Sequence, residues 1–442
     1  MRSRTRRVVA VQGRPKKVDN PLDTAPRGGQ YAVSIISLSL RLIINASCSL
    51  RGVAATLAVF VERGWASFAV PCFSTIRSWL LRVGYRSLTR PLDTAESWLW
   101  LVDHTIQIGT MKLLVILGCP MSQVPFGERA LRLSDLQLVA LVPMDKSNGE
   151  AVAIELRHAA ERTGVPRQIA SDQGPDLRKG ISLFVEQHAE TAPVPDIAHY
   201  GANLLEQAWA DDPRWQQFVQ QMQETSSKLR QTKAAYLLAP RMRPKARFMN
   251  VATLLKFSRR VLKHLHSDSP REKAVDCYSW LKAYDDDDLT AWEREQWLVQ
   301  TTIERVRVQG LHRHLQPELD AAWGEIGTRA STVCIAQKLR EYVTTYQPPT
   351  DEERFVASTE ILESSFGKLK RIEDQQSQDG LTALSLSLGA VVGTQTDADI
   401  REALDATPQK HVDRWTERVL GHSIQWHRQQ FFREATSVTK AE

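Results

Sequence analysis

The stretch Trp98-Leu99-Trp100-Leu101-Val102-Asp103 (WLWLVD) is a run of five apolar residues that ends in an aspartate. Residues 168–172, Gln-Ile-Ala-Ser-Asp (QIASD), repeat the pattern in shorter form. Such short apolar runs are typical of buried strands, and a carboxylate directly after one is costly unless water, a partner or a metal ion stabilises it. Two aspartates in this position indicate a polar site at one rim of a sheet.

Similar short segments surround these two runs and predict the rest of a sheet domain over residues 93–200. The order along the chain is three strands, a helix, a strand, a helix and a last strand, which indicates a mixed five-stranded α/β sheet with flanking helices. Besides the two quoted runs, the predicted strands are 111–117, 136–142 and 194–197, and the predicted helices are 150–162 and 175–187.

A third acidic residue stands far along the chain, in residues 358–370, Ser-Thr-Glu-Ile-Leu-Glu-Ser-Ser-Phe-Gly-Lys-Leu-Lys. Here Glu363 is followed by small residues, an aromatic, a glycine and basic residues. Together with Asp103 and Asp172, this pattern resembles the acidic-triad (DDE/D) transposases and the related integrases, whose core is an RNase H-like fold. Glu360, one helical turn earlier, is the alternative to Glu363 because it falls on much the same side of a helix.

The resemblance implies that Asp103, Asp172 and Glu363 are catalytic and hold two Mg²⁺ ions, for which Mn²⁺ can substitute. Mg²⁺ prefers oxygen ligands, and a pair of such ions can activate an attacking oxygen and neutralise charge on a scissile phosphate. The implied activity is cleavage of DNA at transposon ends and strand transfer into target DNA. The alternative is a catalytically inactive, transposase-derived DNA-binding regulator.

Asp196-Ile197-Ala198-His199 follows the last predicted strand. It resembles the Cys-or-Asp, x, x, His motif of hAT-type and related transposases, which implies that His199 orients a ligand or contacts the scissile phosphate, with Asp196 and His104 as further supporting residues. A satisfied core histidine is the alternative for His199, and Asp196 is equally a structural group. Asp176 is interpreted as a helix-start carboxylate.

The region before the sheet, residues 29–92, predicts a helix-turn-helix-like DNA-binding domain. Ser49 is a plausible cap for a helix over 50–61, and Ser74 begins a second helix that carries Arg77 and Arg82, which we expect to contact DNA. A small helical bundle without DNA contacts would have a similar sequence. Residues 1–28, rich in Arg and Lys, predict a flexible basic arm along phosphates, or else an ordinary solvated tail.

Strand signals are missing between residues 201 and 350, which predict an all-helical insertion before the closing core helix at 351–395 and a helical C-terminal tail at 396–442. In several transposase groups such insertions bind transposon ends and stack a flipped base, so the resemblance implies this role for Trp292 or Trp297. Burial between helices is the commoner position for tryptophan. Lys368, Lys370 and Arg371 follow Glu363 and are expected to contact the DNA backbone.

Bulk properties agree with these expectations. The net charge of +6 and the pI near 9.0 favour a polyanionic partner, here double-stranded DNA. The five cysteines form no C-x-x-C pair, which argues against a zinc site and fits a reducing cytosol. The apolar stretch 31–50 is interrupted by Arg41 and Asn45, so we expect no membrane span. A bacterial, nucleoid-associated insertion-element protein that acts as a homodimer or higher multimer is expected.

Overall fold

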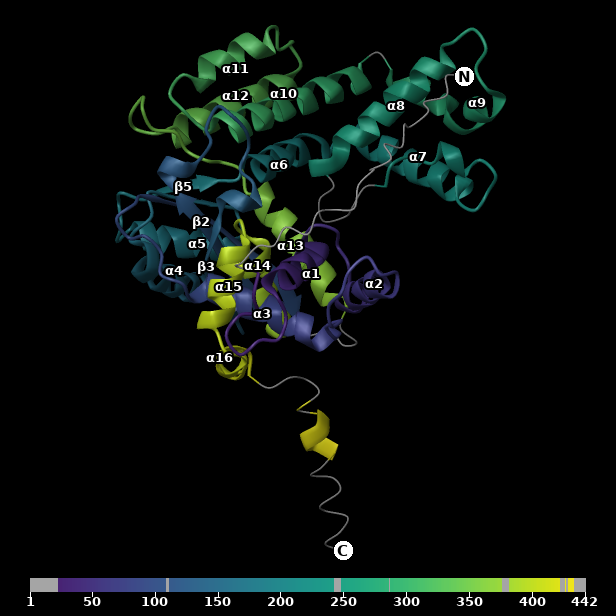
Figure 1. Cartoon of the computed structure of the whole chain (residues 1–442). Helices are drawn as coiled ribbons and strands as arrows, with labels where there is room; N and C mark the ends of the chain where they lie inside the picture. The colour runs from purple at the N-terminus through teal and green to yellow at the C-terminus, as the bar shows by residue number, and fades with distance from the viewer. Residues whose placement is uncertain are drawn as a thin grey trace, which may run out of the picture.

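The computed structural model describes residues 23–108, 111–241, 248–285, 287–375, 381–421, 426 and 428–432 (Figure 1). Most of the expected basic arm, residues 1–22, lies outside the described residues, as do the basic residues Arg243, Lys245 and Arg247 and the end of the expected C-terminal tail.

A five-stranded mixed sheet lies at the centre of the fold and confirms the predicted strands. Its order is β3-β2-β1-β4-β5. The first three strands pair antiparallel, and β4 and β5 run parallel to β1. The strands are β1 (Trp98–Ile108), β2 (Met111–Pro120), β3 (Gln137–Met144), β4 (Gln168–Ser171) and β5 (Ala192–Pro195).

Two helices, α4 (Gly149–Thr163) and α5 (Pro175–Val185), cover one face of the sheet. Because side chains alternate along a strand, Trp98, Trp100 and Val102 of β1 all point to this face, where they pack with the apolar sides of α4 and α5. Leu99 and Leu101 point to the opposite face. This alternation decides on which side the functional residues that follow in β1 lie.

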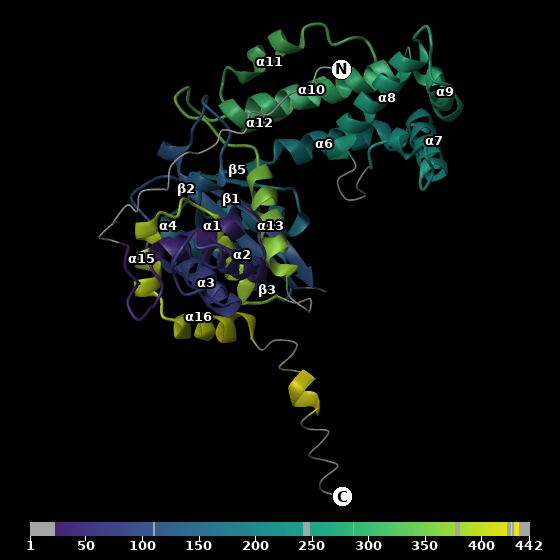
Figure 2. The ribbon, with the colours of Figure 1, turned by 45° about the vertical axis from the view of Figure 1, so that its right-hand side comes forward.

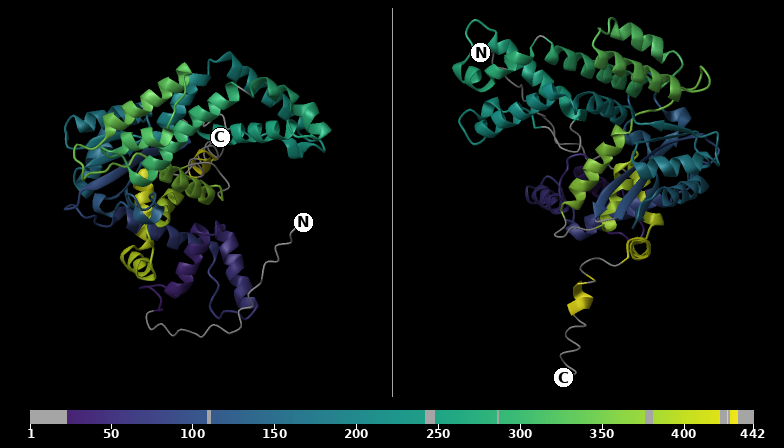
Figure 3. Two further views of the ribbon diagram at one scale, coloured as in Figure 1. Left: turned by 90° about the horizontal axis from the view of Figure 1, so that it is seen from above. Right: turned by 180° about the vertical axis from the view of Figure 1, so that it is seen from behind.

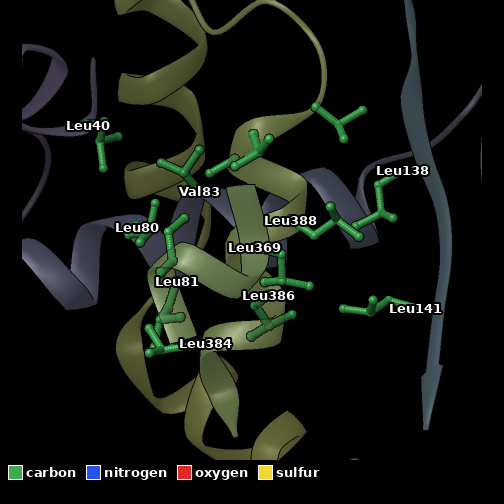
Figure 4. Close-up of a cluster of buried hydrophobic side chains, with 14 of the residues drawn as sticks. Leu40, Leu80, Leu81, Val83, Leu138, Leu141, Leu369, Leu384, Leu386 and Leu388 are labelled. Carbon is green, nitrogen blue, oxygen red and sulfur yellow. The ribbon is translucent and has the colours of Figure 1, made fainter. Parts of the chain in front are cut away.

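The opposite face is covered by helices from both ends of the described chain, in one continuous core. Figure 4 shows leucines and a valine of α1, α3, α13 and the segment 384–388 packed toward Leu138 and Leu141 of β3. The helices of this layer are α1 (Val33–Ile44), α2 (Leu50–Glu62), α3 (Phe73–Thr89), α13 (Glu360–Glu373), α14 (Ser387–Val391), α15 (Asp397–Ala406) and α16 (Gln409–Trp415).

The packing of α3 corrects the expectation of a DNA-reading helix. At Gly84 a Cβ atom would lie 1.8 Å from the carbonyl oxygen of Leu386, so only glycine permits this close approach of α3 to the α14 segment. Arg82 donates hydrogen bonds to the carbonyl oxygens of Thr407 and Leu404. Arg77 is half-buried, and burial lowers the pKa of its guanidinium.

The predicted DNA contact of Arg82 is therefore wrong for this fold, because its guanidinium is bonded to backbone oxygens of the C-terminal helices. The predicted DNA contact of Arg77, which is half-buried, stays a prediction. Helices α1 to α3 share the core of the sheet layer instead of closing a core of their own. Their individual boundaries agree with the sequence: Ser49 caps α2, and its hydroxyl accepts from the amide of Gly52.

Between β5 and α13 the described chain forms a lobe of helices with a separate hydrophobic core. This helical lobe, α6 to α12, lies beyond β5 in Figures 1 and 2, and Figure 3 shows it from above and behind. Its α-helices are α6 (Ile197–Trp209), α7 (Pro213–Leu229), α8 (Val251–Leu265), α9 (Glu272–Tyr278), α10 (Asp288–Gln309), α11 (Leu315–Trp323) and α12 (Ala330–Tyr346).

The helical lobe begins and ends at the same place on the sheet. The amide of Ile197, at the start of α6, donates to the carbonyl oxygen of Ala357, just before α13. The side chain of Gln168 in β4 bonds both backbone groups of Val356. The first and last residues of the helical lobe therefore lie next to each other at the edge of the sheet. Over the described ranges, no helix combines the length and apolarity that a bilayer span needs.

Candidate active site

Asp103 and Asp172 lie next to each other on one face of the sheet. The parallel pairing of β1 and β4 ends at Val102 and Ser171, so the next residue of each strand is an aspartate. Because side chains alternate along a strand, Asp103 lies on the same face as Leu99 and Leu101, and Asp172 on the same face as Ala170. This is the face that the terminal helices cover. β1 itself continues to Ile108, so Asp103 marks the end of the β4 pairing and not, as expected, the end of its own strand.

Glu363 is placed on the same face by α13, which packs against β1. It belongs to the first turn of α13, where Thr359 is the N-cap residue. Its Oε1 lies 4.0 Å from Nε2 of His199, while the Glu360 carboxylate is turned toward α10 and pairs with Arg307 at 3.0 Å. The structure thus brings Glu363 close to the other candidate residues and directs Glu360 away.

The acidic groups of the cluster also influence one another's pKa values. Burial, and then the nearby charge of Asp172, raises the pKa of Asp103 to about 7, with Glu363 adding to the rise. Burial raises the pKa of Glu363, and the charge of His199 opposes this rise. A hydrogen bond with Asp196 raises the pKa of His199 to about 9 against the effect of its burial. At neutral pH a cationic histidine therefore faces acidic groups that are crowded together.

Asp196 connects the two halves of the site. Its side chain is 1% exposed and caps α6, with Oδ1 accepting from the backbone amide and from Nδ1 of His199 at 2.7 and 2.9 Å. Its other oxygen accepts from the amide and the hydroxyl of Thr359 at 2.6 and 3.0 Å. Burial alone would raise the pKa of Asp196, but these hydrogen bonds lower it. One carboxylate thus ties His199 to the start of the helix that carries Glu363.

Thr359 and Gln168 are site-building residues that sequence reasoning missed. Gln168 is fully buried in β4 and holds Val356, and Thr359 joins α13 to Asp196. A glutamine within an apolar strand is the only local signal for the first, since a buried amide needs hydrogen-bond partners. The position of Thr359 four residues before Glu363 carries no such signal.

His104 lies on the opposite face from Asp103, so it does not point into the acidic cluster and any support it gives must be indirect. The two residues are consecutive in β1, so their side chains point to different sides of the sheet. The His104 ring contacts Ser147 and Asp176 beside α5, with Nε2 3.1 Å from the Ser147 hydroxyl. Burial lowers the pKa of His104.

The donor set of the cluster suits a hard divalent cation, since it offers carboxylate oxygens from three separate elements. Asp103, with a raised pKa, is a carboxylate whose charge lacks compensation. As the side chains stand, however, no three His, Cys, Asp or Glu residues of the described ranges are placed to share a metal ion. Asp172 is turned to its own loop, where Oδ1 accepts from Gly174 at 3.0 Å, whereas the Glu363 side chain is 54% exposed and has room to turn.

The expected DNA-contacting residues divide into exposed and buried groups. Lys370 and Arg371 on α13 are exposed and Lys368 is half-buried. Trp292 is fully buried in an aromatic cluster with Trp215 and Phe218, so its expected role in stacking a base is wrong. Trp297 is 37% exposed and its ring lies against Arg294, 4.4 Å from the guanidinium carbon.

A groove of about 490 Å³ opens beside Glu363. Its walls are α13, the end of α10 and the connection between β2 and β3, and Gly127 of that connection donates to the carbonyl oxygen of Val308. The groove therefore joins the acidic cluster to the helical lobe. Its lining includes Phe126, Leu131, Val306, Arg307 and Ile361.

No protein-family model and no curated protein matches the sequence. Among solved structures, the chain is similar to the Drosophila P element transposase in its strand transfer complex, with 12% identity, 87% of this chain and 93% of that chain covered, and a TM-score of 0.38. A likeness this low carries no weight for the function of the chain, which must be argued from the site itself.

Proposed function

We propose that the chain is a DDE-type transposase, a metal-dependent polynucleotidyl transferase that cuts DNA at transposon ends and joins the freed 3′ ends to target DNA. The observation that supports the proposal is that Asp103, Asp172 and Glu363, from three distant parts of the sequence, lie on one face of a β3-β2-β1-β4-β5 sheet. A triad of carboxylates beside a histidine suits chemistry on a phosphodiester.

In this mechanism Asp103, Asp172 and Glu363 would hold two Mg²⁺ or Mn²⁺ ions. The ions, when bound, supply activation of the attacking oxygen and neutralisation of charge at the phosphate. Binding requires the Asp172 side chain to turn away from Gly174 and Glu363 to turn inward from solvent. A cation would also relieve the repulsion between Asp103 and Asp172, which favours this change.

His199 contributes a fixed positive charge. With a pKa of about 9 it is protonated at neutral pH, so both ring nitrogens donate. Nδ1 is held by Asp196, which leaves Nε2 directed toward Glu363 and free to donate to a nonbridging oxygen of the scissile phosphate. In this arrangement Asp196 is a positioning residue, and Lys370 and Arg371 meet the backbone of the same DNA strand further along α13.

The test is cleavage of a plasmid that carries the DNA flanking the reading frame, in Mg²⁺ or Mn²⁺. We expect nicking and strand transfer by the wild-type chain and none by Glu363→Gln. Glu360→Gln is the matched control, because Glu360 lies one turn away and pairs with Arg307. Equal loss in both variants, or full activity of Glu363→Gln, would reject this triad.

Binding of double-stranded DNA without any nicking would favour the alternative, a transposase-derived regulator. We also expect two copies of the chain on paired DNA ends, since both ends of an element must be processed together; light scattering of the protein with and without DNA measures this.

A further inference from the structure

A compact polar network lies on the sheet face opposite Asp103, below the start of α5. At its centre is Asp176, whose side chain is 14% exposed. Its Oδ2 accepts from Nζ of Lys112 at 2.8 Å and from the hydroxyl of Ser147 at 2.5 Å. The ring of His104 closes the group, with Nε2 3.1 Å from the Ser147 hydroxyl and Nδ1 3.7 Å from the same carboxylate oxygen.

These four residues, called here the Asp176 network, come from four different segments. His104 belongs to β1, Lys112 to β2, Ser147 to the connection between β3 and α4, and Asp176 to the first turn of α5. Burial alone would raise the pKa of Asp176, but the hydrogen bonds from Lys112 and Ser147 lower it to about 2. The carboxylate is therefore ionised at any working pH and holds the four segments together through charge-assisted bonds.

The network is not a second hydrolytic site. In a Ser-His-Asp triad the histidine accepts the hydroxyl proton and the aspartate contacts the far nitrogen of the ring. Here the Ser147 hydroxyl donates to Asp176 itself, so its proton is directed to the carboxylate and away from His104. Ser147 is thereby a link in the network and not an activated nucleophile.

The Asp176 network holds the turn that carries Asp172. The turn 172–176 joins β4 to α5, and its two aspartates stand on either side of Gly174. The amide of Gly174 donates to Oδ1 of Asp172 at 3.0 Å. A Cβ on Gly174 would lie 3.1 Å from Oδ1 of Asp172 and 3.4 Å from Oδ1 of Asp176, so the two carboxylates leave little free space across this residue.

We propose that the Asp176 network positions Asp172, by anchoring the far end of its turn to β1, β2 and the β3–α4 connection, so that Asp172 can reach a metal ion shared with Asp103. This inference rests on the proposed function. Asp172 has no strand partner beyond Ser171, so the path of its backbone is set by the turn. An anchored turn limits the conformations that Asp172 can adopt before the metal ion binds. Less conformational entropy is then lost on binding, which favours it.

The experiment measures Mn²⁺ binding to the full chain by electron paramagnetic resonance, independently of DNA cleavage. We expect Asp176→Asn to weaken Mn²⁺ binding by about 10-fold or more, as is usual when a group that supports a metal ligand is lost. Glu150→Gln is the matched control. It breaks the Lys179–Glu150 ion pair between α4 and α5, at 2.5 Å and largely exposed, without touching the turn, and should bind Mn²⁺ as the wild type does.

A second variant guards against a general loss of structure. Ser147→Ala removes one donor to Asp176 and should weaken Mn²⁺ binding less than Asp176→Asn, with an unchanged melting temperature. Excess Mn²⁺ should restore DNA cleavage to both variants, which a merely structural defect would not allow. Unchanged Mn²⁺ binding in folded Asp176→Asn or Ser147→Ala overturns this inference alone. A wild-type chain that binds no Mn²⁺ overturns the proposed function, and this inference with it.

Discussion

Two carboxylates, the fully buried Glu295 in the helical lobe and the half-buried Asp103 in the sheet, have opposite surroundings. Glu295 is fully buried and accepts hydrogen bonds from the Trp209 indole, from Ser331 and from Thr332, at 2.5, 2.5 and 2.8 Å. Asp103 accepts one hydrogen bond, from the amide of His104, and has Asp172 and Glu363 as neighbours. Neutral donors surround the first carboxylate, whereas the second lies near other acidic groups and near the cationic His199.

The two carboxylates differ in their partners. Burial is common to both residues, so burial alone does not identify a site. A buried acid with a full set of donors stabilises the fold, whereas one crowded by like charges costs stability and persists where a ligand relieves the cost.

Replacement of Asp103 by Asn should have the largest effect. The loss of a metal-binding carboxylate is expected to reduce DNA cleavage by about 10³-fold or more, because several kcal/mol of charge stabilisation in the transition state are removed. The variant should fold normally, since the amide keeps the shape without the charge. Nicking rates and far-ultraviolet circular dichroism measure both effects, and a variant with a tenth of wild-type activity would contradict the assignment.

The corresponding change in the helical lobe, Glu295→Ala, should act on stability. It leaves the Trp209, Ser331 and Thr332 donors without their acceptor, at a cost of about 3 kcal/mol in the free energy of unfolding. Urea titration of the helical signal measures the loss. Glu295→Gln retains a carbonyl oxygen in the same place and should lose less. If Glu295→Ala abolished cleavage without lowering stability, the two carboxylates would not differ as described.

The pH dependence of stability without divalent cations offers a third comparison. The pKa of Asp103 is about 7 in the folded chain against an ordinary 3.8, so its contribution is fully present below about pH 4 and is lost as the pH rises through 7. We expect the free energy of unfolding of the wild type to fall across this window by about 2 kcal/mol relative to Asp103→Asn, allowing for partial exposure. Chemical denaturation at pH 5 and 8 tests the slope.

Addition of Mg²⁺ at pH 8 should restore the stability of the wild type and leave Asp103→Asn unchanged, since a ligand that binds only the folded state stabilises it. His199, with a pKa near 9, stays charged through the whole window in both proteins and does not contribute to their difference. A wild-type curve that stays parallel to that of Asp103→Asn would mean that Asp103 is already compensated.

The smallest expected effects contrast two cations. Arg82 donates to two backbone carbonyl oxygens, so Arg82→Gln should cost about 1 kcal/mol in stability and leave DNA affinity unchanged. Lys370 is exposed on α13, so Lys370→Gln should weaken DNA binding about two- to fivefold without loss of stability and reduce its salt dependence. Fluorescence anisotropy at two salt concentrations distinguishes them, and reversed effects would restore α3 as the DNA-reading helix.

The sequence was sufficient to predict the strands of the sheet, because each strand is a dense apolar run. It was also sufficient to predict that the two aspartates are neighbours, because parallel strands whose pairing ends together place their next residues side by side. The side on which His104 lies was also within reach, since consecutive strand residues alternate. Trp292 falls at helical spacing from Leu289 and Val299, three residues before it and seven after it, a pattern that indicates burial.

The remainder depends on contacts between residues far apart in the sequence. The carbonyl acceptors of Arg82 belong to residues 404 and 407, and no local pattern around α3 points to them. Asp196 bonds Thr359 across the whole helical lobe, and Asp176 collects partners from three other segments. Propensity and periodicity describe one segment at a time, so these pairings require the folded chain.

The hydrogen bonds from Ile197 to Ala357 and from Thr359 to Asp196 join the two ends of the helical lobe at one place on the sheet. The entropy lost in closing a loop grows only with the logarithm of its length. A longer or shorter helical lobe would therefore change the stability of the sheet domain little. Descendants of this chain can therefore gain, lose or replace helices of the lobe while the acidic residues of the sheet keep their places.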